Sequence, residues 1–346
     1  MFKRRHFLLT VVALLLGAFG GVEPLHPAPF QPGQIFVAYG GSNIGVFADT
    51  VSLTGTPIQT LSVPLPGFLK TSGLGGGGGL TLDEEGNLYA TLSDNNRTVG
   101  LIKFRASDGS QVFAKTYTIS GVDDFRSLVA KNGRIYVATD RGIRVFDAAT
   151  GERISTADFG GTLAYRDLAF DSQGNLYAVR ETGDGRLVIR RWASGSYSGL
   201  GSVVFSSGTY VNSDPRALVM DGDGNIYITL NLPKAVIKVR PDPVGGTDET
   251  RDIGTVLARY DAPLGIDRLI GLDYDPGVQK LFASHTGTGI GQILALDPKT
   301  GSWTAFGPNN LTYARWLAVY PTPEPATVVL LLVGLGFMMR KRKRNG

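Results

Sequence analysis

Short apolar segments separated by turn residues recur along the interior of the chain. The clearest copies of the unit cover residues 80–89, 168–177 and 218–227, a shorter copy covers 128–136, and a divergent one covers 272–282. Each reads as a strand, an Asp/Gly/Asn turn and a second strand that begins with an aliphatic-aromatic pair. The Asp side chain caps such a turn, and Gly or Asn takes its left-handed position. The pattern therefore predicts a series of β-hairpins.

A third alternating segment follows each hairpin, and we expect a fourth, edge strand after it. The third segments cover residues 100–104, 142–146, 187–192, 235–239 and 292–296. Four short strands in about 40 to 55 residues is the spacing of a β-propeller blade. No segment between the two ends has the pattern of a long amphipathic helix.

The two ends of the repeat region complete one blade. Residues 34–38 match a second strand without a first strand before it, and residues 316–320 match a first strand without a second one after it. Pairing these segments closes the ring and removes open sheet edges. The expected fold is all-β, a six-bladed β-propeller over residues 34–320. Seven blades is the alternative if residues 242–252 contain further strands.

The first 20 residues have the composition of a signal peptide and predict a signal helix. Three basic residues precede an apolar run over residues 7–19, and a small-x-small site ends it. We expect cleavage after Gly20, which leaves residues 21–33 as a leader. The pair Arg4-Arg5 also resembles the twin-arginine export signal, although such pairs occur in ordinary signal peptides too. Either route places the propeller outside the cytoplasm.

Residues 321–346 form a second targeting segment. An uncharged stretch over residues 326–339 follows the motif Pro323, Glu324 and Pro325. A basic tail comes next, formed by Arg340, Lys341, Arg342, Lys343 and Arg344. Fourteen helical residues reach about 21 Å, less than the bilayer core of about 30 Å, so a permanent span by this short apolar helix is marginal. The tail is expected to stay cytoplasmic.

This succession of parts resembles the PEP-CTERM sorting signal of Gram-negative bacteria. The resemblance implies recognition by a membrane-embedded cysteine protease, an exosortase, which removes the tail near the Pro-Glu-Pro motif. It also implies transient anchoring in the inner membrane, followed by a location at the cell surface or outside the cell. Proteins with this signal often belong to organisms that make exopolysaccharide. The expected partners are the export machinery and an exosortase.

Charge and cysteine content narrow the remaining classes. The formal net charge of the chain is +4, but eight basic residues and no acidic ones lie in the signal peptide and the basic tail, so the rest of the chain carries −4. The basic isoelectric point therefore does not indicate nucleic acid as a partner. The chain has no cysteine, which excludes disulfides and thiolate metal sites.

Arginine recurs where the predicted innermost strands begin. Each such residue stands two to four positions before the first apolar residue of its repeat: Arg126, Arg166, Arg216, Arg268 and Arg315. Equivalent positions of a propeller lie in a ring around one channel mouth, and guanidinium groups there would bind a carboxylate, a phosphate or an acidic sugar. The structural alternative is pairing with nearby acids, which are Asp123, Asp124, Asp167, Asp214 and Asp267.

The repeat also resembles NHL-type and gluconolactonase/regucalcin-type six-bladed propellers. For gluconolactonases the resemblance implies a divalent metal held at the channel mouth by one Glu and several Asn or Asp residues. No such set matches here, since Arg126, Arg166 and Arg216 occupy positions of that kind. Asp221 begins a calcium-like loop, but its twelfth position is Pro233 instead of Glu. We therefore predict no metal, no cofactor and no catalytic residue.

These observations favour a non-enzymatic module at the cell surface or in the extracellular matrix. Its expected ligand is anionic, such as an acidic exopolysaccharide bound at the arginine ring. One alternative is a hydrolase or lyase that acts on a polysaccharide or lactone. The other is a scaffold that binds proteins through its loops.

Overall fold

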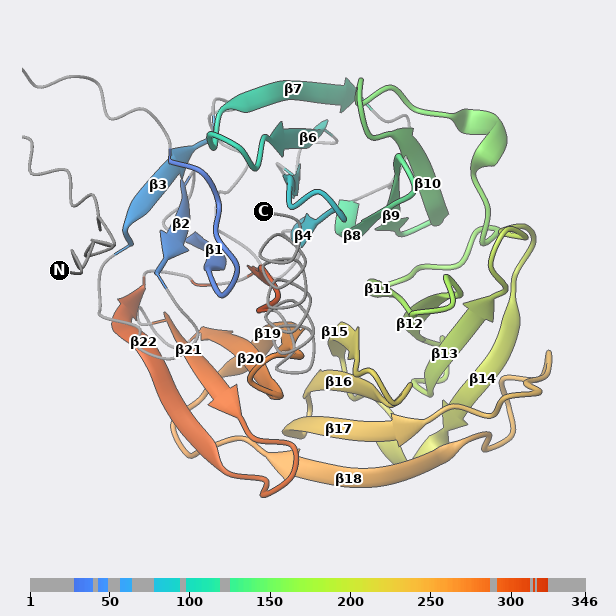
Figure 1. Ribbon diagram of the computed structural model, residues 1–346. Coiled ribbons are helices and arrows are strands. Elements are labelled where there is room, and N and C mark those ends of the chain that lie inside the picture. Colours follow the sequence, from blue (N-terminus) through green and yellow to red (C-terminus); the bar gives the residue numbers. More distant parts are fainter. Residues whose placement is uncertain are drawn as a thin grey trace, which may run out of the picture.

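The computed structural model describes residues 28–39, 43–48, 57–63, 78–93, 98–118, 125–286, 291–311, 314 and 316–322. Six antiparallel sheets stand around a central axis, each with one strand innermost (Figure 1). The predicted all-β, six-bladed propeller is confirmed. The predicted signal helix and C-terminal helix lie outside the described residues. Within the described ranges, no helix is both long and apolar enough to cross a membrane.

The blades are named A to F in chain order. Blade A contains, from the axis outward, β23 (Leu317–Val319), β1 (Ile35–Tyr39), β2 (Asn43–Phe47) and β3 (Gln59–Ser62). Blade B contains β4 (Gly78–Leu82), β5 (Leu88–Ser93), β6 (Thr98–Phe104) and β7 (Gln111–Thr118). Blade C contains β8 (Phe125–Lys131), β9 (Arg134–Thr139) and β10 (Gly142–Asp147).

The other three blades have four strands each. Blade D contains β11 (Asp167–Phe170), β12 (Leu176–Glu181), β13 (Leu187–Trp192) and β14 (Ser202–Ser207). Blade E contains β15 (Pro215–Met220), β16 (Ile226–Asn231), β17 (Lys234–Arg240) and β18 (Thr255–Asp261). Blade F contains β19 (Arg268–Asp275), β20 (Lys280–Thr286), β21 (Gly291–Leu296) and β22 (Trp303–Leu311).

Blade C departs from the prediction of four strands per blade. Its outer edge has only isolated bridges, Ile143 to Phe159 and Phe146 to Arg153, and a short 3-10 helix, η1 (Ser155–Ala157). Asp158 accepts a hydrogen bond from the Val145 amide at 3.0 Å, in place of a ladder partner. A side chain here satisfies an edge amide that a fourth strand would otherwise pair.

The first and last strands of the propeller domain close the ring as predicted. Strand β1 pairs with β23 in antiparallel register, with Ile35 opposite Val319. Just outside this pair, the Gly33 amide donates to the Tyr320 carbonyl at 2.7 Å, and the Tyr320 amide donates to the Gln34 carbonyl at 2.8 Å. The innermost strand of blade A therefore comes from the opposite end of the domain.

Two aspartates of β19 hold the closing strand from the neighbouring blade. Asp273 accepts the Val319 amide at 2.7 Å. Asp275, which is wholly buried, accepts both the amide of Thr322 at 3.2 Å and its hydroxyl at 2.7 Å. The described chain thus stays fixed to blade F up to the residue before Pro323. We call Asp275 and Thr322 the closing clamp.

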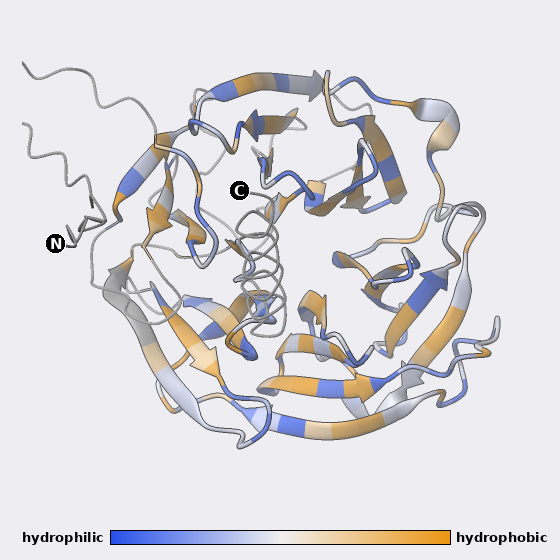
Figure 2. Ribbon diagram, viewed as in Figure 1, coloured by the Kyte–Doolittle hydropathy of each residue, from blue (hydrophilic) through white to orange (hydrophobic). Residues whose placement is uncertain are grey.

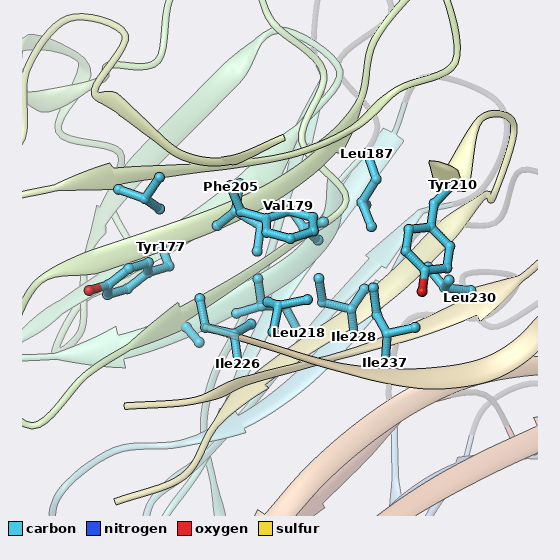
Figure 3. Close-up of a cluster of buried hydrophobic side chains, with 14 residues drawn as sticks. Tyr177, Val179, Leu187, Phe205, Tyr210, Leu218, Ile226, Ile228, Leu230 and Ile237 are labelled. Atoms are coloured by element: carbon cyan, nitrogen blue, oxygen red, sulfur yellow. The ribbon is translucent and has the colours of Figure 1, made fainter. Parts of the chain in front are cut away.

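The apolar core lies between the blades. Apolar positions recur in the strands of every blade (Figure 2), and the buried residues gather in clusters where adjacent sheets face each other. In the cluster between blades D and E, Val179 and Phe205 of one sheet face Ile228 and Ile237 of the next (Figure 3). Since both faces of an inner sheet are covered, strands such as β16 are buried along their whole length. Burial of this kind is the main stabilising term of the fold.

The hairpin turns form as the repeat predicts. In blades B, D and E the turn aspartates are Asp83, Asp171 and Asp221. Each accepts the amide of the Asn four residues later at 2.8–2.9 Å and the hydroxyl of the Tyr six residues later at 2.9–3.2 Å. The turn glycine has a positive φ, as at Gly224 (+77°), where a side chain would be strained. The Asp221 segment is therefore a hairpin turn built by its own side chains.

Residues 242–252 do not form a seventh blade. They belong to an excursion between β17 and β18 that lies along β14 of blade D, with bridges from Val203 to Gly246 and from Ser206 to Ile253. Glu249 at its centre binds Arg180 at 2.6 Å and Arg190 at 2.8 Å, both of which are buried. We call this contact the Glu249 latch, since it fixes blade E to the outer part of blade D.

Candidate functional site

The described arginines of the predicted ring all lie where innermost strands begin. Arg126 is the second residue of β8, Arg166 directly precedes β11, Arg216 is the second residue of β15, and Arg268 is the first of β19. Because the innermost strands run in the same direction around the axis, these starts share one end of the channel. Arg315, the sorting motif and the basic tail lie outside the described residues.

Two of these arginines have acidic partners. Arg126 Nε donates to Asp140 Oδ1 at 2.6 Å, and Arg216 donates to Asp214 Oδ2 through Nε at 3.1 Å and Nη2 at 2.5 Å. All four side chains are about a fifth to a quarter exposed. Both pairs lie within a blade or at its entry, not between blades. Of the acids that the sequence analysis named as alternative partners, Asp214 therefore does pair with an arginine, whereas Asp140, the partner of Arg126, was not among them.

Arg166 differs from Arg126 and Arg216 in having no acidic partner in the part of the chain that the structure describes. It is half-buried, and within the described residues its guanidinium makes no ion pair and no hydrogen bond. Burial lowers the pKa of Arg166 and repulsion from Arg126 and Arg216 lowers it further, while the carboxylates of Asp214 and Asp140 partly oppose this shift. A cation held between two other cations is a favourable place for an anion to bind. Arg268 is likewise half-buried and unpaired in the described part of the chain.

Acidic and amide groups lie among the arginines, and the sequence analysis did not identify them as a group. They stand at the ends of second strands, four residues after the aromatic residue of the aliphatic-aromatic pair: Asp140, Glu181 and Asn231. Asn231 Nδ2 donates to Asp214 Oδ2 at 2.9 Å. This constant offset from Tyr136, Tyr177 and Tyr227 was the available sequence signal.

The charges of this network shift one another's pKa values. Burial alone would raise the pKa of Asp214, but the hydrogen bond from Asn231 and the charge of Arg216 leave it lowered overall. Burial raises the pKa of Glu181, and the Asp214 carboxylate adds to that effect. The positive charges of Arg166 and Arg216 lower the pKa of Glu181, so both guanidinium groups lie close to its carboxylate.

Two carboxyl groups line the channel below the mouth. The cavity there has a volume of about 170 Å³. Asp167 accepts the Leu168 amide at 2.8 Å, the Leu218 amide of the next blade at 2.5 Å and the Ser127 hydroxyl of the previous blade. The Asp273 carboxylate likewise accepts the amide of the next residue, Tyr274, and the amide of Val319 in blade A. These acids satisfy channel-edge amides of the innermost strands, which ladder pairing leaves free.

The sequence analysis named Asp167 as a possible arginine partner, but its carboxylate binds two backbone amides and the Ser127 hydroxyl instead. Burial raises the pKa of Asp167 and of Asp273 to about 7, although Asp273 keeps partial exposure to the channel. Asp267 forms no ion pair with Arg268 within the described residues, and Asp123 and Asp124 lie outside them.

The donor set at the mouth does not fit the divalent metal that the gluconolactonase resemblance implies. Asp140 and Asp214 are each engaged by a guanidinium. Nowhere in the described part of the chain do three His, Cys, Asp or Glu side chains gather at metal-binding distance. His285 is buried, its Nδ1 has no partner among the described residues, and burial lowers its pKa.

Comparison with known proteins supports the fold and no more. No protein-family model matches the chain, and no curated protein does. A protein of unknown function from Bacteroides caccae matches with a TM-score of 0.50 at 10% identity, over 83% of this chain and 98% of the other. The calcium-binding protein regucalcin from Agrobacterium tumefaciens has a TM-score of 0.49 at 17% identity, covering 70% of this chain and 77% of its own. Virginiamycin B lyase from Staphylococcus aureus has a TM-score of 0.43 at 13% identity, covering 68% and 71%.

Proposed function

We propose that this protein is an exported propeller that binds an anionic ligand, such as an acidic exopolysaccharide, at the arginine mouth. The observation that carries the proposal is Arg166, which is half-buried near Arg126 and Arg216 and forms no ion pair with any described residue. A partly buried charge without a paired counter-ion is unfavourable, and an anionic ligand would supply the paired counter-ion. Arg268, also unpaired among the described residues, extends the positive surface to blade F.

The targeting segments define where this binding takes place. The signal peptide exports the chain, and the PEP-CTERM-like segment holds it at the inner membrane until an exosortase cuts near Pro323, Glu324 and Pro325. The closing clamp supports this order, because the folded chain is fixed as far as Thr322. Cleavage after that residue leaves the closing strand in place at the cell surface or in the matrix.

The binding test compares polymers and variants. The purified full chain is titrated with polygalacturonate and with neutral dextran, and we expect binding to the acidic polymer alone. Arg166→Ala should weaken that binding at least tenfold, since one charge-assisted contact has about this value. Because Arg166 has no protein partner in the described structure, the melting temperature should stay unchanged.

Arg105→Ala is the matched control. It removes the same charge from the turn between β6 and β7, at the opposite end of the channel, where Arg105 is half-exposed. Its binding should equal that of the unmodified chain. Equal binding by the Arg166 and Arg105 variants, or no binding to any acidic polymer, would refute the proposal.

A further inference from the structure

The mouth between blades D and E contains hydrogen-bond acceptors that lack donors. We define the D–E site as Arg166, Glu181, Asp214, Arg216 and Asn231. Within it, Glu181 Oε1 and Asn231 Oδ1 are buried and have no hydrogen-bond partner among the described residues. Arg216 and the Asn231 amide group are both occupied by Asp214. Within the described residues, the site thus has a guanidinium that forms no ion pair and two acceptors that lack donors.

A ligand that completes these groups needs two features at once. Leaving a buried acceptor unpaired is more costly than a made hydrogen bond is favourable, so such acceptors select partners that bring donors. Arg166 requires a carboxylate or a similar anion, for which its planar donors are suited. Glu181 requires hydroxyl or other N–H and O–H donors close to that anion. Hydroxylated acids carry both features, whereas simple anions carry only the first.

The charge of the site disfavours more than one negative charge on the ligand. Asp214 compensates Arg216, and Glu181 lies close enough to Arg166 for the charge of Arg166 to lower its pKa, although the two form no ion pair. A monoanionic carboxylate matches Arg166, while a dianionic phosphate would add a second charge beside Glu181 and Asp214.

Resting on the proposed function, we propose that the D–E site binds a hydroxylated monocarboxylate of the uronic acid type. Arg166 pairs with its carboxylate, and Glu181 accepts hydrogen bonds from its hydroxyl groups. Glu181 is only half-buried, and rotation about its terminal torsion is soft, so the carboxylate turns toward the ligand at little cost.

The test uses three probes of similar size. Glucuronate has a carboxylate and hydroxyls, cyclohexanecarboxylate has only the carboxylate, and glucose has only the hydroxyls. Calorimetric titration of the full chain should show at least tenfold tighter binding of glucuronate than of the other two. Inorganic phosphate should bind more weakly than glucuronate. A polygalacturonate arm shows whether the site takes the unit free or within a polymer, and binding of either form supports the proposal.

Variants separate the two roles within the site. Glu181→Ala should cost glucuronate about tenfold in affinity while cyclohexanecarboxylate binds as before or more tightly, because a negative charge is gone. Glu181→Gln keeps an acceptor oxygen and should recover much of the glucuronate affinity. Arg166→Ala should lose the binding of both glucuronate and cyclohexanecarboxylate.

The outcomes distinguish this inference from the proposed function. Equal affinity for glucuronate and cyclohexanecarboxylate, or equal losses of both in Glu181→Ala, overturns the hydroxyl recognition and leaves the anion site standing. Binding of neither carboxylate overturns both proposals.

Discussion

Asp275 of blade F accepts both the backbone amide and the side-chain hydroxyl of Thr322, three residues beyond the strand that closes the ring. A methyl group on Gly277 would lie 1.7 Å from the Thr322 hydroxyl oxygen, so the two segments meet without room for another side chain. One buried carboxylate therefore anchors the C-terminal end of the described chain to a neighbouring blade.

We expect Thr322→Val to lower the free energy of unfolding by about 1 to 3 kcal/mol, because it leaves Asp275 short of a donor in a buried position. Urea denaturation measures the loss, and amide exchange should show β23 opening more often. Thr250→Val is the control, since Thr250 makes the same kind of bond to Asp248 on an exposed turn. Equal effects of the two substitutions would contradict a special role for the clamp.

Stability should fall as pH rises toward neutrality. The pKa values of Asp167 and Asp273 are raised from an ordinary 3.8 to about 7 by burial, so between these pH values the folded state holds more protons than the unfolded state. Their contribution is fully present below pH 3.8 and is lost as pH rises to about 7, at up to about 1.4 kcal/mol per pH unit for each group. His285, whose pKa is lowered, opposes this trend with one group against two.

Urea midpoints at pH 5.5 and 7.5 test this expectation. The unmodified chain should be more stable at pH 5.5, and a chain with Asp167→Asn and Asp273→Asn should show a flatter dependence. A midpoint that increases with pH in both proteins would contradict it.

The Glu249 latch should be a large single contribution to stability. Glu249→Ala leaves Arg180 and Arg190 as buried guanidiniums without a carboxylate, which typically costs about 3 to 5 kcal/mol. Asp252→Ala is the matched change, since Asp252 pairs with Arg186 but is 69% exposed, and it should cost less than about 1 kcal/mol. Thermal unfolding of the two variants measures the difference in stability. Similar losses of stability would show that the latch contributes no more than an exposed ion pair.

Tyr227→Phe should cost about 1 kcal/mol of unfolding free energy, because its hydroxyl donates to the Asp221 carboxylate at 3.0 Å. Tyr210→Phe supplies the comparison, because Tyr210 is also buried but donates no hydrogen bond within the described residues. Urea midpoints decide between them, and identical values would mean that the turn needs no tyrosine hydroxyl.

The blade repeat could be predicted from the sequence because its signals are local. Asp221, Gly224 and Tyr227 lie within seven residues of one another, and the turn they build is read directly from their spacing. Ring closure was also predictable, since a second strand without a first one at residue 34 requires a partner from elsewhere. The missing edge strand of blade C was not, because Asp158 replaces a ladder contact that alternation alone cannot reveal.

The ion pairs among the mouth residues could not be predicted from the sequence, and the reason is a different one. Arg126, Arg166 and Arg216 are equivalent in the repeat, yet among the described residues Arg126 and Arg216 have an acidic partner and Arg166 has none. The difference depends on whether the second strand of the same blade ends in Asp140 or Glu181, and on the turn that places Asp214 beside Arg216. These contacts depend on side-chain directions that the hydrophobic pattern does not determine.

The pairing of β1 with β23 makes the beginning and end of the domain neighbours in space, so the domain is suited to circular permutation. A circular permutant that links Thr322 to residue 28 and opens the turn at residues 194–196 would build blade A from one continuous segment. The β1–β23 pair would become a local hairpin, and closure of the ring would pass to the pair of β13 and β14 in blade D. Since one pair of strands from the two chain ends closes the ring in both proteins, such a chain should fold to the same ring and keep the same mouth.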